Sequence, residues 1–154
     1  MYADAEKLVE DLQSNESNSS YSLTLAGKLK LEQGDSESAA EYLLEAKKKI
    51  AKDAPLDEKS ILADELYSAG LFAEASKIYE SFINPRIASD MSRKLLNTYY
   101  RAGYHDKALK LCGLIQSEYG VSRYLTEMES TIYEDIGELA KAQKVCESYI
   151  KDNP

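Results

Sequence analysis

Histidine, cysteine and tryptophan are scarce: the 154 residues include one histidine, two cysteines and no tryptophan. Metal sites need histidine, cysteine or carboxylate clusters at tight spacing, and acidic pairs such as Asp35/Glu37 lack that spacing. The single histidine, His105, precedes Asp106 in a predicted turn, and no serine or cysteine nucleophile is expected beside it. The sequence therefore predicts no catalytic site, no metal and no cofactor, so we do not expect an enzyme.

Long apolar runs and an excess of positive charge are also absent. No run approaches the roughly 20 apolar residues that span a bilayer, so no membrane span is expected. Nineteen basic against 27 acidic residues give a net charge of −8, which repels phosphate backbones and argues against nucleic acid as a partner. The two cysteines offer no disulfide framework, and this favours a cytoplasmic location.

A glycine followed five residues later by an alanine occurs four times along the chain. The pairs are Gly34/Ala39, Gly70/Ala75, Gly103/Ala108 and Gly137/Ala142, with the glycines 36, 33 and 34 residues apart. A period near 34 in a helical pattern is typical of a helix-turn-helix solenoid. The glycine supplies the left-handed conformation that ends one helix, and the small alanine lets the two helices cross closely.

The third unit illustrates the helical pattern of each repeat. Leu95, Leu96 and Tyr99 share one face of a helix predicted over about 89–101. A second apolar stripe predicts another helix over about 106–118. Each unit is therefore expected to be a pair of amphipathic helices joined by a tight turn.

These motifs resemble the tetratricopeptide repeat (TPR) family. With the four glycines at family position 15, position 20 is alanine in every unit. Position 8, which is small in the family, is Gly27, Ala63 and Ser130, whereas Leu96 departs from the pattern. The resemblance implies an all-α fold, a right-handed superhelical solenoid of antiparallel helix pairs.

The register predicts one TPR-like array over residues 1–154. It consists of the second half of a truncated repeat at 2–19 and four repeats at 20–55, 56–88, 89–122 and 123–154. Ala5 lies 34 residues before Ala39, and Pro154 falls on family position 32. We interpret the chain as a segment of a larger protein; the alternative is a complete small protein with an N-terminal capping helix.

Three smaller features have two interpretations each. Cys112 and Cys146 take the same slot of successive repeats, which indicates equivalent packing positions, with a redox pair or half a metal site as the alternative. Lys47–Lys49 are typical of a solvated helix C-terminus, with a basic docking spot as the alternative. Gly113 inside a helix costs about 1 kcal/mol relative to alanine, which implies close approach by a neighbour or a softened helix.

The resemblance also predicts a function, because the first helices of TPR units line a concave face that binds peptides. The positions that point into this face are Arg93, Asn97, Tyr100 and Arg101 in the third unit, Asp64 and Tyr67 in the second, and Lys28 in the first. We therefore expect a scaffold that binds a partner peptide or helix in its groove. The alternative for these residues is an internal network in which the arginines pair with acids on neighbouring helices.

The sequence bears on two further functions. A receptor for the acidic tails of chaperones is not expected, because Ile61 and Asp90 stand where the family's two-carboxylate clamp needs asparagine and lysine, and the next register fails as well. The competing function is a regulatory or self-assembly arm of a larger enzyme or transcriptional regulator, packing end to end. Val145, Tyr149 and Ile150 on the last helix support such self-association through the terminal helices.

Overall fold

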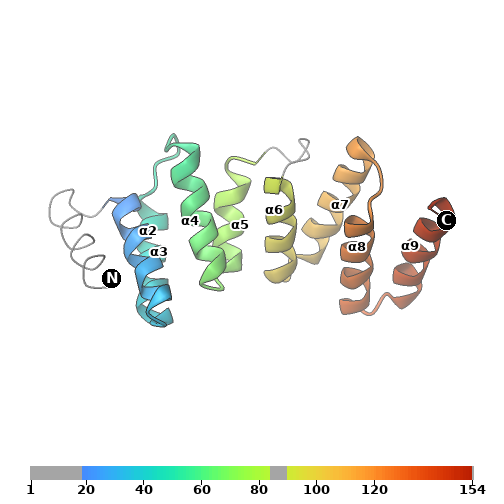
Figure 1. Ribbon diagram of the computed structural model, residues 1–154, viewed down its shortest axis with the longest axis horizontal. Helices are drawn as coiled ribbons and strands as arrows, with labels where there is room; N and C mark the ends of the chain where they lie inside the picture. The colour runs from blue at the N-terminus through green and yellow to red at the C-terminus, as the bar shows by residue number, and fades with distance from the viewer. Residues whose placement is uncertain (1–18, 84–89, 154) are drawn as a thin grey trace. The chain divides into compact units, whose positions relative to one another are not determined.

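A computed structural model of the chain describes residues 19–83 and 90–153, and over these ranges it contains helices and no strands. Figure 1 labels the eight helices, which are α2 (Ser20–Glu32), α3 (Ser36–Lys49), α4 (Leu56–Ser68), α5 (Phe72–Glu80), α6 (Asp90–Arg101), α7 (His105–Tyr119), α8 (Arg123–Asp135) and α9 (Leu139–Asp152). The predicted all-α class is confirmed. Most of the predicted half-repeat, with Ala5, and Pro154 lie outside the described residues.

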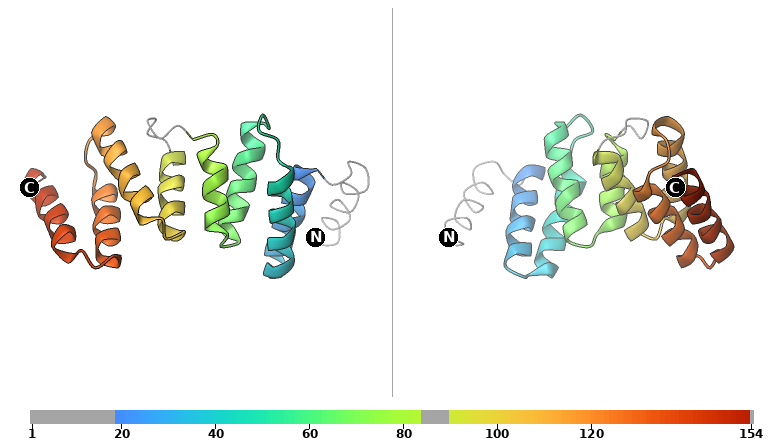
Figure 2. Two further views of the ribbon diagram at one scale, coloured as in Figure 1. Left: turned by 180° about the vertical axis from the view of Figure 1, so that it is seen from behind. Right: turned by 45° about the vertical axis from the view of Figure 1, so that its right-hand side comes forward.

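The helices form two compact units, which we call unit 1 (α2–α5) and unit 2 (α6–α9). In unit 1, α2 packs against α3 and α4, α3 packs against α4, and α4 packs against α5. In unit 2, α7 packs against α6 and α8, and α8 packs against α9. Helices that are joined by a tight turn lie side by side in the opposed views of Figures 1 and 2.

The helix-pair turns depend on glycine, as the repeat predicts. Gly34 has a φ of 80°, and its amide donates to the Leu31 carbonyl at 3.0 Å. The next amide, that of Asp35, donates to the Lys30 carbonyl at 2.9 Å, which completes a Schellman motif. The same pair of bonds and a positive φ recur at Gly70, Gly103 and Gly137. Only glycine adopts this conformation without a steric penalty, and this explains why a glycine recurs at the turn of each helix pair.

The small residues of the repeat lie where helices cross. The four repeat alanines, Ala39, Ala75, Ala108 and Ala142, are all buried. Gly27 on α2 is equally constrained, because a Cβ atom there would lie 2.6 Å from the Leu43 Cγ on α3. Leu96, which departs from the small-residue pattern, is itself fully buried in unit 2.

Gly113 differs from the sequence prediction. It is exposed on α7, and a Cβ atom added to it would meet no atom within 4 Å. The predicted close approach by a neighbour is therefore wrong, and the softened helix stays a prediction. Among the described helices, none has both the length and the apolar character that crossing a membrane requires.

Candidate functional site

The candidate site lies on α6, where four of the predicted groove residues follow one stripe of the helix. Arg93 and Arg101 are exposed, and Asn97 and Tyr100 are half-buried. The spacing of three and four residues places side chains on one helix face. These four side chains therefore lie along one face of α6 in unit 2.

Arg93 is held by an aromatic ring of α8. Its guanidinium carbon lies 5.3 Å from the centroid of the Tyr124 ring, a cation–π arrangement. The Tyr124 hydroxyl donates a hydrogen bond of 3.2 Å to Asn97 Oδ1, which links the ring back to α6. Arg93 and Asn97 thus share Tyr124 as their contact on the neighbouring helix, and the three side chains hold one another in place.

Tyr100 makes a second link from α6 to α8. Its hydroxyl donates to the Asp135 carboxylate, and this hydrogen bond, followed by burial, raises the pKa of Tyr100 above its ordinary value. The Tyr100 ring also meets the His105 ring edge-on, with centroids 6.2 Å apart. His105, the only histidine of the chain, therefore packs against an aromatic ring at the start of α7.

An open pocket of about 600 Å³ lies beside Arg93. Its lining residues come from the start of α6, the end of α7 and the start of α8, and they are Asp90, Ser92, Arg93, Ile115, Tyr119, Gly120, Ser122, Tyr124 and Leu125. Ile115, Leu125 and the two tyrosine rings make much of this wall apolar. The pocket can accept an apolar side chain next to a group that the guanidinium binds.

Among the described residues, the guanidinium of Arg93 contacts an aromatic ring rather than a carboxylate, although Asp90 lines the same pocket. No carboxylate among these residues pairs with its guanidinium, whose recorded contact is the Tyr124 ring. The neighbouring cation Arg123 differs, because its Nε donates to Glu127 Oε1 at 2.7 Å on the same helix. Arg93 is therefore the lining residue that can bind an incoming carboxylate.

The three predicted groove residues of unit 1 make contacts inside that unit. Lys28 Nζ on α2 lies 3.3 Å from Glu65 Oε1 on α4. Asp64 accepts a hydrogen bond from the hydroxyl of buried Tyr79 on α5, and burial, then this bond, raises the Tyr79 pKa. The Tyr67 ring meets the Phe72 ring edge-on at 5.1 Å. These three side chains therefore contact other helices of unit 1, and their role in a groove stays a prediction.

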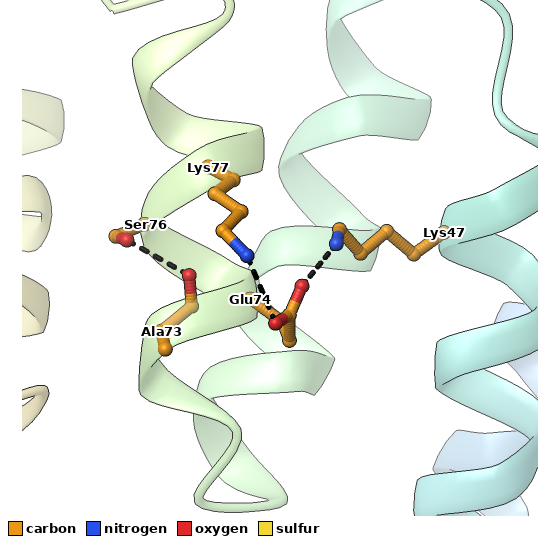
Figure 3. Close-up of polar contacts among 5 residues, drawn as sticks. All are labelled: Lys47, Ala73, Glu74, Ser76 and Lys77. Atoms are coloured by element: carbon orange, nitrogen blue, oxygen red, sulfur yellow. Dashed lines mark hydrogen bonds and ion pairs between the residues drawn. The ribbon is translucent and has the colours of Figure 1, made fainter.

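The lysine run at the end of α3 is also engaged internally. Lys47 forms an ion pair with Glu74 on α5, and Lys77 Nζ lies 3.1 Å from the other oxygen of the same carboxylate (Figure 3). The hydrogen bond from Lys47 holds the pKa of Glu74 below its ordinary value. Lys48 pairs with Glu45 one turn earlier at 3.1 Å. The ion pairs of Lys47 and Lys48 favour the interpretation of this run as a solvated helix C-terminus over that of a basic docking spot.

The two cysteines occupy packing positions and are both free thiols. Cys112 on α7 is fully buried, and this burial, with a smaller contribution from Glu129, raises its pKa to about 12. Cys146 on α9 is half-buried and contacts Ser130 Oγ at 3.3 Å. Within the described residues, no group of three or more histidine, cysteine and carboxylate side chains could hold a metal ion.

Sequence reasoning missed much of the pocket wall. Ile115, Tyr119 and Leu125 were not expected at the site, because they come from the end of a second helix and the start of the following first helix. Ser122 caps α8 by accepting a hydrogen bond from the Leu125 amide at 3.4 Å. The signal available in the sequence is the segment Tyr119-Gly120-Val121-Ser122, in which a tyrosine precedes a glycine and a helix-capping serine.

A solved structure with the same fold is described as a kinesin light chain from Podosopora anserina with nearly identical TPR-like repeats. It matches this chain with a TM-score of 0.64 and 18% sequence identity, over 96% of this chain and 82% of that chain. No protein-family model matches the sequence, and the search of curated proteins gives no match. At this identity the likeness shows the fold, so the TPR-like fold expected from the Gly/Ala register is confirmed.

Proposed function

We propose that this chain is a non-enzymatic, cytoplasmic protein-interaction module that binds a partner peptide on the α6–α8 surface. The TPR-like fold supports an interaction scaffold in general. The observation that carries the proposal is Arg93, which lines a pocket of about 600 Å³ and has no carboxylate partner among the described residues. The peptide that fits is one with an acidic side chain next to an apolar one.

The chemistry of the pocket favours this class of peptide. A carboxylate that meets a guanidinium makes charge-assisted hydrogen bonds that are worth about 1.5–3 kcal/mol. Tyr124 holds the guanidinium in place, so less side-chain entropy is lost when the carboxylate binds. Ile115 and Leu125 offer apolar contact for the neighbouring side chain of the peptide.

Two nearby groups refine the specificity. Asp90 lines the same pocket, so a peptide that combines one acid with an amide or a cation is favoured over a purely acidic stretch. Asn97 uses Oδ1 to accept from Tyr124, and its Nδ2 amide can donate to a peptide carbonyl. Arg101 lies two turns from Arg93 on the exposed stripe and extends the surface along α6.

The proposal is tested with peptides selected on the intact chain from a random linear library and then measured by calorimetry. We expect the selected peptides to share an acidic residue beside an apolar one. Arg93→Gln should weaken their binding about 10- to 100-fold, since a charge-assisted contact is lost. Arg93→Lys should recover only part of this affinity, because an ammonium lacks the planar fork of a guanidinium.

Lys110→Gln is the matched control. Lys110 is exposed on α7 of the same unit and does not line the pocket, so its loss changes the net charge equally and should leave affinity within about twofold. Equal losses of peptide affinity in Lys110→Gln and Arg93→Gln would mean that Arg93 acts through long-range electrostatic attraction and not through direct contact with the peptide. Selection of peptides that bind Arg93→Gln as tightly as wild type would contradict the proposed site.

A further inference from the structure

A second pocket, of about 420 Å³, is formed within unit 1. Its walls come from the loop after α3, from α4 and from the end of α5, and its lining residues are Ile50, Ala51, Lys52, Lys59, Ile78 and Ser81. The volume lies within the range of about 300–1,000 Å³ that is usual for ligand pockets. All of this pocket therefore belongs to one compact unit, and none of it depends on the α6–α8 surface.

The pocket has an apolar floor and a loop wall that hydrogen bonds hold in place. Ile78 on α5 is 8% exposed, and Ile50 at the end of α3 is half-buried. The Ile50 amide donates to the Ala46 carbonyl at 3.0 Å, and the Ala54 amide donates to the Ala51 carbonyl at 3.1 Å. Because the wall is already ordered, less conformational entropy is lost when a ligand binds.

The charged residues that line this pocket are both lysines. Lys59 on α4 is half-buried, and its Nζ donates to the Lys52 carbonyl, which leaves two N–H donors for a ligand. Lys52 is exposed on the loop, and neither lysine has a carboxylate partner in the part of the chain that the structure describes. The nearby Lys49 differs, because its Nζ lies 4.0 Å from Glu45 Oε1. An apolar floor thus lies beside two cations that no lining acid neutralises.

Unit 2 has a pocket of about 370 Å³ at the same place in the repeat register. Four lining positions coincide: Val121, Thr126, Val145 and Ser148 take the places of Lys52, Lys59, Ile78 and Ser81. The charged residues that line the pocket of unit 2 are Glu129 and Asp152, so its charge is opposite. The repeat therefore produces the hollow, whereas the residues particular to unit 1 make it cationic.

We propose that the pocket of unit 1 is a second peptide site, which binds a partner segment with an apolar residue between two acidic ones. The apolar side chain lies over Ile50 and Ile78, and the flanking carboxylates meet the ammonium groups of Lys52 and Lys59. Charge complementarity argues for this occupant, since two cations match two acids, whereas a small monocarboxylic acid would neutralise only one. The pocket beside Arg93 differs, because an acid, Asp90, lines it.

Isoleucine-methyl NMR of the intact 154-residue chain tests the site, because Ile50 and Ile78 line this pocket and Ile115 lines the pocket beside Arg93. The probe is the peptide Gly-Glu-Leu-Glu-Gly with acetylated and amidated ends. We expect it to shift the methyl signals of Ile50 and Ile78 saturably. The peptide with glutamine in place of both glutamates should bind at least about fivefold more weakly, because both charge-assisted contacts are lost.

Paired lysine variants test the source of the affinity. Lys52→Gln/Lys59→Gln should weaken binding of the glutamate peptide about five- to tenfold and leave binding of the glutamine peptide unchanged. Lys52→Arg/Lys59→Arg should keep most of the affinity, because the charge is retained. Lys30→Gln/Lys48→Gln is the matched control, since both lysines belong to unit 1 and neither lines the pocket, so the affinity should stay within about twofold. Unchanged methyl signals outside the pocket in the free variants would show that the fold is intact.

Four results would overturn the second site. The first is that neither Ile50 nor Ile78 shifts at peptide concentrations up to about 5 mM. The second is that the glutamine peptide, or the control variant Lys30→Gln/Lys48→Gln, gives the same result as its counterpart. The third is that hexanoate binds these methyl groups at least as tightly as the peptide, which would make the occupant a small amphiphilic acid. The fourth is a shift at Ile115 alone, which would place the peptide beside Arg93 and leave the α6–α8 proposal intact.

Discussion

The two units use their charged side chains differently. In unit 1 the cations at helix faces meet carboxylates of another helix, as Lys28 does with Glu65 and Lys47 with Glu74. In unit 2 Arg93 meets an aromatic ring instead, and within the described residues no carboxylate neutralises it. Cations of the two units therefore have different kinds of partner, a carboxylate of another helix in unit 1 and an aromatic ring for Arg93 in unit 2.

A second contrast lies within unit 2. The packing positions of α7 are buried, whereas the equivalent positions of α9 are half-exposed, as Cys112 and Cys146 demonstrate. The difference has a simple cause, because α8 packs against α7 and no further described helix covers α9.

The largest effect is expected in the reactivity of the two thiols. At pH 8 the burial that raises the pKa of Cys112 to about 12 leaves almost none of it as thiolate. Cys146 is half-buried and accessible. Iodoacetamide should therefore alkylate Cys146 at least about a hundredfold faster than Cys112, measured by mass spectrometry of peptides at low protein concentration.

The variant Cys146→Ala isolates the slower thiol. Its remaining cysteine should react quickly only after urea unfolds the chain. Equal alkylation rates in the native wild type would show that α8 does not protect α7, and the contrast between α7 and α9 would then be lost.

The local parts of the fold could be predicted from the sequence. A left-handed turn requires glycine and a close helix crossing requires a small residue, so the Gly/Ala register locates the turns at Gly34 and Gly103 and the buried Ala39 and Ala108. These features depend on backbone conformation within a few residues. The bounds predicted for the two helices of the third repeat, about 89–101 and 106–118, lie within one residue of those of α6 and α7 for the same reason.

The contacts of the site could not be predicted in the same way. Arg93 meets Tyr124, and Asp64 meets Tyr79, across helices whose rotation the sequence does not specify. A repeat register tells which positions face inward on average, but a long side chain reaches whichever neighbour its helix rotation offers. The prediction of a close neighbour at Gly113 is wrong for a related reason. A glycine within a helix does not reveal whether that face of the helix packs against another helix or is open.

Two helix-interior glycines, one in each unit, should respond in opposite directions to alanine. Gly27→Ala should lower the free energy of unfolding by about 1–3 kcal/mol, because the new methyl group overlaps the Leu43 side chain. Gly113→Ala should raise it by about 0.5–1 kcal/mol, because the methyl group meets nothing and the helix gains propensity. Urea unfolding followed by circular dichroism measures both changes.

The sign of each change is the decisive observation. A stabilising Gly27→Ala would mean that α2 and α3 separate enough to admit the methyl group. A destabilising Gly113→Ala would mean that the open side of α7 is covered in solution.

The smallest effect concerns the acid dependence of unit 1. The hydrogen bond from Lys47 keeps the folded-state pKa of Glu74 below the ordinary 4.5, so the folded chain binds fewer protons than the unfolded chain in acid. The stabilisation is thus present above about pH 4.5 and is lost as the pH falls through the folded-state pKa. Glu74→Gln should cost up to about 1 kcal/mol at pH 7 and nothing near pH 3.

The matched substitution in unit 2 is Glu127→Gln. Its ion pair with Arg123 lies within one helix, and the Glu127 side chain is 61% exposed against 25% for Glu74. A pair of that kind is worth at most about 0.5 kcal/mol, so the loss at pH 7 should be smaller than for Glu74→Gln. Urea unfolding of both variants at pH 7 and pH 3 makes the comparison. If Glu127→Gln costs as much as Glu74→Gln, the bridge between α3 and α5 adds nothing beyond an ordinary surface pair, and the two units do not differ in how they use their charges.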